Sequence, residues 1–134
     1  MSDDCIFCRI VAGQARSWKV YEDESTFAFF DVNPVSEFHT LVVTKRHVTD
    51  VVALPATEWA SLSRGVKAVV DLLAARVGLR DVQILHSAGA AAQQDVFHAH
   101  VHVVPRRAGD GLDIDWATHP EWREHFDALV GRLA

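Results

Sequence analysis

Residues 97 to 105 read Phe-His-Ala-His-Val-His-Val-Val-Pro, so that three histidines alternate with small or branched apolar residues. This alternation is the period of a β-strand, whose successive side chains point to opposite faces. His98, His100 and His102 would therefore share one face, with the outer two about 13 Å apart. Since Zn–N bonds are about 2.0–2.1 Å long, two neighbouring histidines could share a metal ion but all three could not. The strand thus offers imidazoles for different tasks; a half-exposed strand with incidental histidines is the plainer alternative.

The composition is that of an ordinary globular protein. The chain has 134 residues, 49% of them hydrophobic, and a formal net charge of −5. This length predicts one domain over residues 1–134, and the negative charge argues against nucleic-acid binding. Without a long apolar run or a basic, apolar leader, we expect a cytoplasmic protein with no membrane partner. A local basic spot could still bind a small phosphorylated ligand, or be solvated surface charge; the candidates are Lys45, Arg46, Arg106 and Arg107.

The rest of the chain predicts more strands than helices. Strands are expected over residues 18–22, 26–30, 40–44 and 82–85, besides the histidine stretch. Apolar residues recur every three or four positions over 55–77, which predicts a long helix that stops at Gly78. A second amphipathic helix is expected over 120–133. Strands in runs with few helices predict an α+β fold: a mainly antiparallel sheet of about five strands, one long central helix and a C-terminal helix.

The two cysteines of the chain form the motif Cys5-Ile-Phe-Cys8. Such a pair can be a redox dithiol, although the βαβ context of those sites is missing here. It can also be two buried thiols without a function, or half of a zinc site that two further ligands complete. His47 and His98 are available as ligands, but spacing alone does not select them.

The segment His98-Ala-His100-Val-His102-Val-Val104 resembles the signature of the histidine triad (HIT) family, His-φ-His-φ-His-φ-φ with φ apolar, at every position. The resemblance extends over residues 5 to 106, through segments 5–10, 29–34 and 39–47 and the loop before the triad. The short chain is similar to the Hint-type or bacterial branch. The resemblance implies a HIT-like version of the α+β fold described above.

The resemblance also implies unequal roles for the triad histidines. The middle one, His100, would be the nucleophile that attacks the α-phosphorus of a nucleotide. A neutral imidazole suits this task near pH 7, because it is nucleophilic and forms a phosphoramidate that water can cleave. His102 would position phosphate oxygens, and His39 would orient the triad.

The nucleoside end of the site would be apolar except for one carboxylate. By resemblance, Asp31 accepts hydrogen bonds from the ribose hydroxyls, although an Asx turn before Asn33-Pro34 is the alternative. Gln94 would contribute hydrogen bonds to the phosphate. The base would lie in an apolar slot that includes Ile6, Phe7 and Phe29, for which ordinary core packing is the alternative.

Relatives that keep both cysteines bind a zinc ion through this pair and two histidines. The resemblance therefore implies one structural zinc ion per chain, held by Cys5, Cys8, His47 and His98. Such a closed site would pin the N-terminal segment to the sheet and would not be catalytic. His98 would then bind metal while its neighbours in the triad serve the reaction.

Three positions depart from the family pattern, one of them Glu37, which replaces the small residues usual before Phe38-His39. Ser87 stands where an amide side chain is frequent, so that a contact to the ribose or phosphate is expected to be lost or to run through water. Asp95 stands where many relatives carry Ser or Thr. Its carboxylate would repel phosphate if ionised, or donate a proton if its pKa were raised. These changes concern the rate and the leaving group more than the chemistry itself.

The implied function is a nucleotide hydrolase or nucleotidyl transferase that acts at the α-phosphate of AMP-like or GMP-like substrates such as purine nucleoside phosphoramidates. A dinucleoside polyphosphate hydrolase of the Fhit type is the second interpretation. The third is a nucleotide-binding or scaffold protein with little turnover. Relatives of this size are usually homodimers, paired through the long helix and an edge strand, so that a homodimer is expected.

Overall fold

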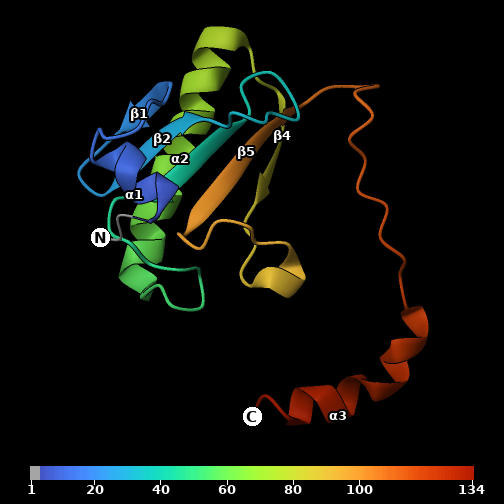
Figure 1. Ribbon diagram of the computed structural model, residues 1–134. Coiled ribbons are helices and arrows are strands. Elements are labelled where there is room, and N and C mark those ends of the chain that lie inside the picture. The colour runs from blue at the N-terminus through green and yellow to red at the C-terminus, as the bar shows by residue number, and fades with distance from the viewer. Residues whose placement is uncertain (1–3) are drawn as a thin grey trace.

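The strands form where β-branched and aromatic residues gather in the sequence. β1 (Lys19–Glu22), β2 (Thr26–Phe30), β3 (Thr40–Thr44), β4 (Asp81–Leu85) and β5 (His100–Arg106) make one antiparallel sheet in the order β1-β2-β3-β5-β4 (Figure 1). The computed structural model describes residues 4–134. The predicted α+β fold, with five strands and one long helix, is confirmed.

Both faces of the sheet are covered, so that β2 and β3 are buried along almost their whole length. On one face α2 (Ala56–Val77) packs against alternate strand residues, among them Ala28, Val42, Val101 and Val103. On the other face the shorter α1 (Ile6–Val11) packs against the residues between them: Phe27, Phe29, Leu41 and Val43. His100 pairs with Val43 and His102 with Leu41, which places both histidines on the α1 face.

His98 departs from the predicted strand. β5 begins only at His100, and His98 lies in a bend before it with a fully buried side chain. The bend is held by Ala99, whose N–H donates to the Val48 carbonyl at 2.6 Å and whose carbonyl accepts from the Thr44 N–H at 3.4 Å. The expectation that all three histidines continue one regular strand face is therefore wrong for His98.

A glycine brings the long helix close to the sheet. A Cβ atom at Gly65 would lie 2.5 Å from Cγ2 of Thr26, so that only a residue without a side chain fits this crossing of α2 over β2. The helix ends as predicted at Gly78, where a φ of 70° turns the chain into β4. Across residues 4–134 the structure has no helix that is both long and apolar enough to span a membrane.

The C-terminal end of the chain leaves the sheet. After β5 it runs past β4, the edge strand on that side, and its two last helices lie apart from the sheet (Figure 1). In place of the single predicted helix over 120–133, a 3-10 helix, η2 (Pro120–His125), is followed by α3 (Phe126–Gly131). Every residue from 113 to 134 is exposed. We call residues 113–134 the C-terminal arm.

Candidate functional site

A cavity of about 340 Å³ opens on the α1 face of the sheet. It is bounded by α1, by the end of β2 and the turn after it, by β5 and by the loop that precedes β5. It brings together seven of the ten residues predicted to act on a substrate: Ile6, Phe7, Phe29, Asp31, Asp95, His100 and His102. Ser87, Gln94 and His39 do not line it.

His100 is held in one tautomer by the backbone. Its Nδ1 lies 2.7 Å from the carbonyl oxygen of His98, and because a carbonyl can only accept, Nδ1 carries the proton. Burial lowers the pKa of His100, which favours the neutral ring. The other nitrogen, Nε2, is therefore unprotonated and free to act as a nucleophile. The Phe7 ring packs against this imidazole with its centroid 5.1 Å away.

His102 has the opposite tautomer, and His39 determines it. The Val35 N–H donates to Nδ1 of His39 at 3.1 Å, so that a neutral His39 carries its proton on Nε2. That Nε2–H donates in turn to Nδ1 of His102 at 2.9 Å. Burial lowers the pKa of His39, and that of His102 to about 4, so both rings are neutral at pH 7. His102 is thereby left with its proton on Nε2, as a hydrogen-bond donor.

Asp31 serves the turn after β2 and also lines the cavity. Its Oδ1 accepts from the Asn33 N–H at 2.8 Å, which is the Asx turn considered above, while Oδ2 lies 3.5 Å from Nε2 of His39. Asp31, His39 and His102 are close enough to bind a cation together. A metal ion at Nε2 of His39 would, however, displace its proton to Nδ1, against the Val35 N–H. The arrangement therefore favours a chain of hydrogen bonds.

A separate cluster of soft ligands lies beside the N-terminal end of α1. It consists of the side chains of Cys5, Cys8, His47 and His98. The Nδ1 atoms of the two histidines are 3.2 Å apart, and the S–N distances are 3.2 Å from Cys8 to His47, 3.4 Å from Cys5 to His98 and 3.5 Å from Cys8 to His98. Tetrahedral zinc has N–N edges of about 3.4 Å and S–N edges of about 3.6 Å. The four side chains fit a closed zinc site.

His98 is oriented toward this cluster by a backbone carbonyl. Its Nε2 lies 2.6 Å from the carbonyl oxygen of Thr44 and must donate to it, which leaves Nδ1 unprotonated and facing the thiols. This is the support that metal-binding histidines usually have. Burial lowers the pKa of His98 to about 4. The side chain does not line the cavity, so the structure separates His98 from His100 and His102, which do.

Gln94 holds the loop before β5 together from the inside. Its Oε1 accepts from the Gly89 N–H at 2.8 Å, and its Nε2 donates to the carbonyls of Thr49 at 2.8 Å and Val96 at 3.1 Å. The side chain is buried, with 5% of its surface exposed. These contacts assign Gln94 a positioning role, in place of the direct phosphate contact that the resemblance implied.

His86 is a neighbour of His100 that the sequence analysis missed. Its Nδ1–H donates to the backbone carbonyl of His100 at 2.8 Å, and its Nε2 accepts from the Val51 N–H at 3.0 Å. β4 pairs with β5 only up to Leu85 opposite His102. The His86 side chain thus supplies the donor where the edge strand has ended. The available signal was a polar residue shortly after the strand predicted over 82–85.

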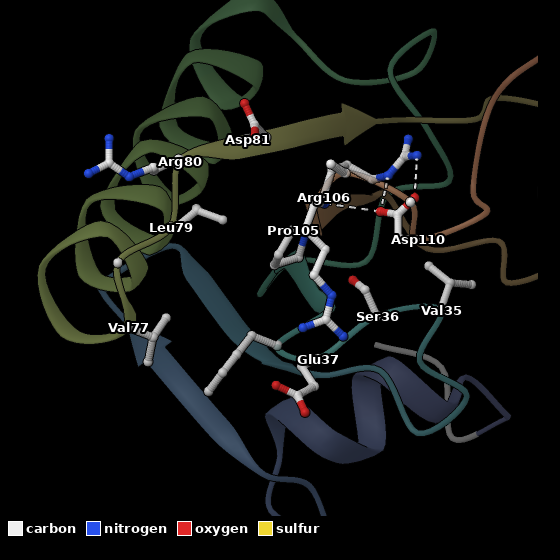
Figure 2. A pocket seen from close by; sticks show the side chains of 15 residues that line it. Val35, Ser36, Glu37, Val77, Leu79, Arg80, Asp81, Pro105, Arg106 and Asp110 are labelled. Carbon is white, nitrogen blue, oxygen red and sulfur yellow. Dashed lines mark hydrogen bonds and ion pairs between the residues drawn. The ribbon is translucent and has the colours of Figure 1, made fainter.

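The basic residues singled out from the sequence lie elsewhere. Lys45 pairs with Glu22 at 2.8 Å, and Arg46 pairs with Glu58. Arg106 and Arg107 line a larger cavity of about 500 Å³ at the far ends of β5 and α2, where Figure 2 shows Arg106 held by Asp110. This ion pair keeps the pKa of Asp110 well below its usual range. No histidine or cysteine lines that larger cavity. Although it is larger, it therefore lacks the side chains of the candidate functional site.

Comparison with known proteins finds related sequences. An uncharacterised HIT-like protein from Methanocaldococcus jannaschii is 41% identical over 107 residues, which are 80% of this chain and 82% of that protein. The adenylylsulfatase HINT3 of Arabidopsis thaliana is 32% identical over 88% of this chain and 58% of its own length.

Solved structures show the same fold. The crystal structure of a HIT family protein from Bacillus anthracis matches 99% of this chain and 96% of its own with a TM-score of 0.90 and 32% identity. A zinc-bound histidine triad family protein from Mycobacterium smegmatis matches 97% and 95% with a TM-score of 0.77 and 32% identity. The family model for the HIT domain matches residues 12–109. This chain therefore belongs to the HIT domain family.

Proposed function

We propose that this protein is a nucleotide hydrolase or nucleotidyl transferase that acts at the α-phosphate of purine nucleoside phosphoramidates or related nucleotidyl substrates. One observation carries the proposal: His100 has an unprotonated Nε2, and the neighbouring His102 has a protonated one, at the wall of one cavity. A nucleophile and a donor for phosphate oxygens thus stand side by side. A relative named an adenylylsulfatase supports a nucleotidyl substrate.

The reaction would take two steps at His100. Nε2 attacks the α-phosphorus, and the new N–P bond forms as the bond from phosphorus to the leaving group breaks. The leaving group departs with that electron pair and takes up a proton from water. The Nδ1–H of His100 keeps its hydrogen bond to the His98 carbonyl. This hydrogen bond stabilises the positive charge of the substituted ring. Water then cleaves the N–P bond, releasing the nucleoside monophosphate and neutral His100.

The other residues of the cavity would bind and orient the nucleotide. The Nε2–H of His102 donates to a phosphate oxygen, and the remaining lone pairs of Asp31 accept from the ribose hydroxyls. The base lies among Ile6, Phe7 and Phe29, whose side chains form the apolar wall of the cavity. Asp95 places a carboxylate near the phosphate. Ser87 makes no direct contact in this proposal, since it lies outside the cavity wall.

Trapping of the intermediate tests the proposal. The protein is mixed with adenosine or guanosine 5′-phosphoramidate, quenched in acid-free denaturant and analysed by mass spectrometry. We expect a nucleotidyl adduct on His100 and its loss in His100→Asn. His119→Asn, which changes an exposed histidine of the arm, should keep both adduct and turnover. Equal turnover by His100→Asn would contradict the proposal.

Two other functions are separated by the choice of substrate. A Fhit-type hydrolase would cleave diadenosine polyphosphate faster than phosphoramidate at matched concentration. A scaffold protein would bind nucleoside monophosphates and turn over neither substrate, and the carboxylate of Asp95 at the cavity is the feature that favours it.

We further propose that Cys5, Cys8, His47 and His98 hold one structural zinc ion. The tetrahedral fit of their ligand atoms supports this, as does the zinc-bound relative. Zinc would supply folding stability there and no chemical step. We expect one zinc ion per chain by elemental analysis, lost in Cys8→Ser and kept in Asp31→Asn. Loss in Asp31→Asn instead would place the metal in the cavity, against this proposal.

We also propose a homodimer. β4 is an edge strand with Ile84 and Leu85 exposed by 46% and 38%, and the arm exposes Trp116 by 80% and Leu133 by 86%. Such apolar surface on a free edge and a detached arm favours a partner. The partner we propose is a second copy, and the Bacillus anthracis structure matches 99% of the chain, arm included. A monomer in sedimentation equilibrium would contradict this.

The cytoplasmic location and the lack of nucleic-acid binding stay predictions.

A further inference from the structure

Arg16 is the only lysine or arginine among the residues that line the 340 Å³ cavity. It lies in the loop between α1 and β1, next to Trp18. The Trp18 carbonyl accepts from the Phe30 N–H at 3.0 Å, which ties this loop to the end of β2. The sequence analysis did not consider Arg16, because it belongs to no basic cluster.

Arg16 and His100 reach the cavity from different parts of the fold, Arg16 from the loop before β1 and His100 from β5. In the sheet order β1-β2-β3-β5, the strand that follows Arg16 is three strand spacings from the strand of His100. Three spacings are about 14 Å. This separation suits the two ends of a nucleoside monophosphate, with phosphorus at His100 and the far edge of the base toward Arg16.

The surroundings of Arg16 leave its hydrogen-bond donors available. The guanidinium carbon lies 4.6 Å from the centroid of the Trp18 ring, so that one face of the cation is covered. Within residues 4–134 the structure shows neither an ion pair nor a hydrogen bond from the Arg16 side chain. Arg46 and Arg106, in contrast, are paired with carboxylates. Stacking orients the plane of a guanidinium while its in-plane N–H groups remain unpaired.

We propose that Arg16 reads the base of the nucleotide and selects 6-oxopurines, guanine and hypoxanthine, over adenine. This inference rests on the proposed function, which places phosphate at the histidines and ribose at Asp31. The O6 and N7 atoms of guanine are two adjacent acceptors that match two N–H groups of a guanidinium. Adenine presents an amino group in place of O6, and a donor there opposes the cation.

Binding of nucleoside monophosphates tests the proposal without any turnover. GMP, IMP and AMP are titrated into the full-length protein by calorimetry. We expect GMP and IMP to bind with similar affinity, each about 10-fold tighter than AMP. Arg16→Ala should abolish the difference by weakening GMP and IMP while leaving AMP nearly unchanged. Since Arg16 is exposed, its replacement should leave the melting temperature in place.

Arg9→Ala is the matched control. Arg9 is an exposed arginine on α1 that does not line the cavity, so its removal costs the same charge and should preserve the preference. Equal affinity of the wild-type protein for the three nucleotides overturns the proposal, and so does a lack of binding. An equal loss for all three in Arg16→Ala also overturns it, because Arg16 would then bind phosphate. A preference that depends on Arg16 without a His100 adduct would instead refute the proposed function alone.

Discussion

Two histidines on one strand can have opposite chemical roles because of the groups that hold their Nδ1 atoms. Nδ1 of His100 faces a carbonyl oxygen and must carry a proton, whereas Nδ1 of His102 accepts a proton from His39. The difference originates in the Val35 N–H, two hydrogen bonds away from His102. Two backbone groups and the His39 side chain therefore decide which ring has an unprotonated Nε2 and which has a protonated one.

His86 provides a test of how firmly His100 is held. Replacement by Phe keeps the aromatic contact with Trp59 but removes both hydrogen bonds, leaving the His100 carbonyl without its donor. We expect the free energy of unfolding to fall by about 1–3 kcal/mol, measured by urea denaturation, together with a lower kcat. His86→Gln should recover much of both, because an amide keeps a donor and an acceptor. Full stability of the Phe variant would contradict this role.

Asp95 places a negative charge where phosphate is proposed to bind. Since its side chain is exposed at the cavity, Asp95→Asn should strengthen binding of a nucleoside monophosphate about 2- to 5-fold, corresponding to roughly 0.4–1 kcal/mol. The gain should shrink as salt is added. Calorimetric titration measures both effects. Asp127→Asn, on the distant arm, is the control and should change neither.

The residues of the site were predictable to different degrees. The triad signature pointed to His100 and His102, and the resemblance of segment 29–34 pointed to Asp31; all three line the cavity. The resemblance placed Gln94 at the phosphate, whereas its amide is engaged by two backbone groups of its own loop and by the Thr49 carbonyl before α2. Arg16 and His86 carry no motif, and only the folded chain brings them to the cavity and to the His100 carbonyl.

At the scale of the elements, the sequence predicted those helices and strands whose apolar pattern extends over enough residues to be recognised. α2 has 22 residues with a repeating apolar stripe, and the strands have a clear two-residue period or a continuous apolar run. α1 spans six residues, less than two turns, so that its period was not recognisable in the sequence. Its N-terminal cap is Cys5, whose Sγ accepts from the Cys8 N–H at 3.4 Å. The helix thus begins at the proposed zinc site.

The crossing of α2 over β2 gives a prediction for Gly65. Gly65→Ala should improve the helix but force a methyl group against Thr26, for a net loss of about 1–3 kcal/mol in unfolding free energy. Chemical denaturation measures it. The double variant with Thr26→Ser removes the methyl group in the way and should recover most of the loss. A stabilised Gly65→Ala protein would show that the two elements can separate without cost.

At the scale of the whole molecule, the buried histidines make stability depend on pH. Burial lowers the pKa of His39, and that of His102 to about 4, below the ordinary value of 6.5. The unfolded chain therefore binds more protons between these values, and stability that is complete above pH 6.5 is lost as the pH falls toward 4. Urea denaturation across this range should show a falling free energy of unfolding. His102→Gln should show a smaller fall, and an identical slope in both proteins would exclude His102 as a cause.

The C-terminal arm exposes several large apolar residues, which the proposed dimer would bury. Phe126 and Leu129 are exposed by 52% and 44% although both are large and apolar. If the arm packs on a second copy, Phe126→Asp removes about 1.5–3 kcal/mol of burial and should raise the dimer dissociation constant about 10- to 100-fold. Glu124→Gln changes a neighbouring charge and should leave the dimer intact. Sedimentation velocity over a range of concentrations measures both. A dimer that is indifferent to Phe126→Asp must be held by β4 and α2 alone, and the arm would then serve another partner.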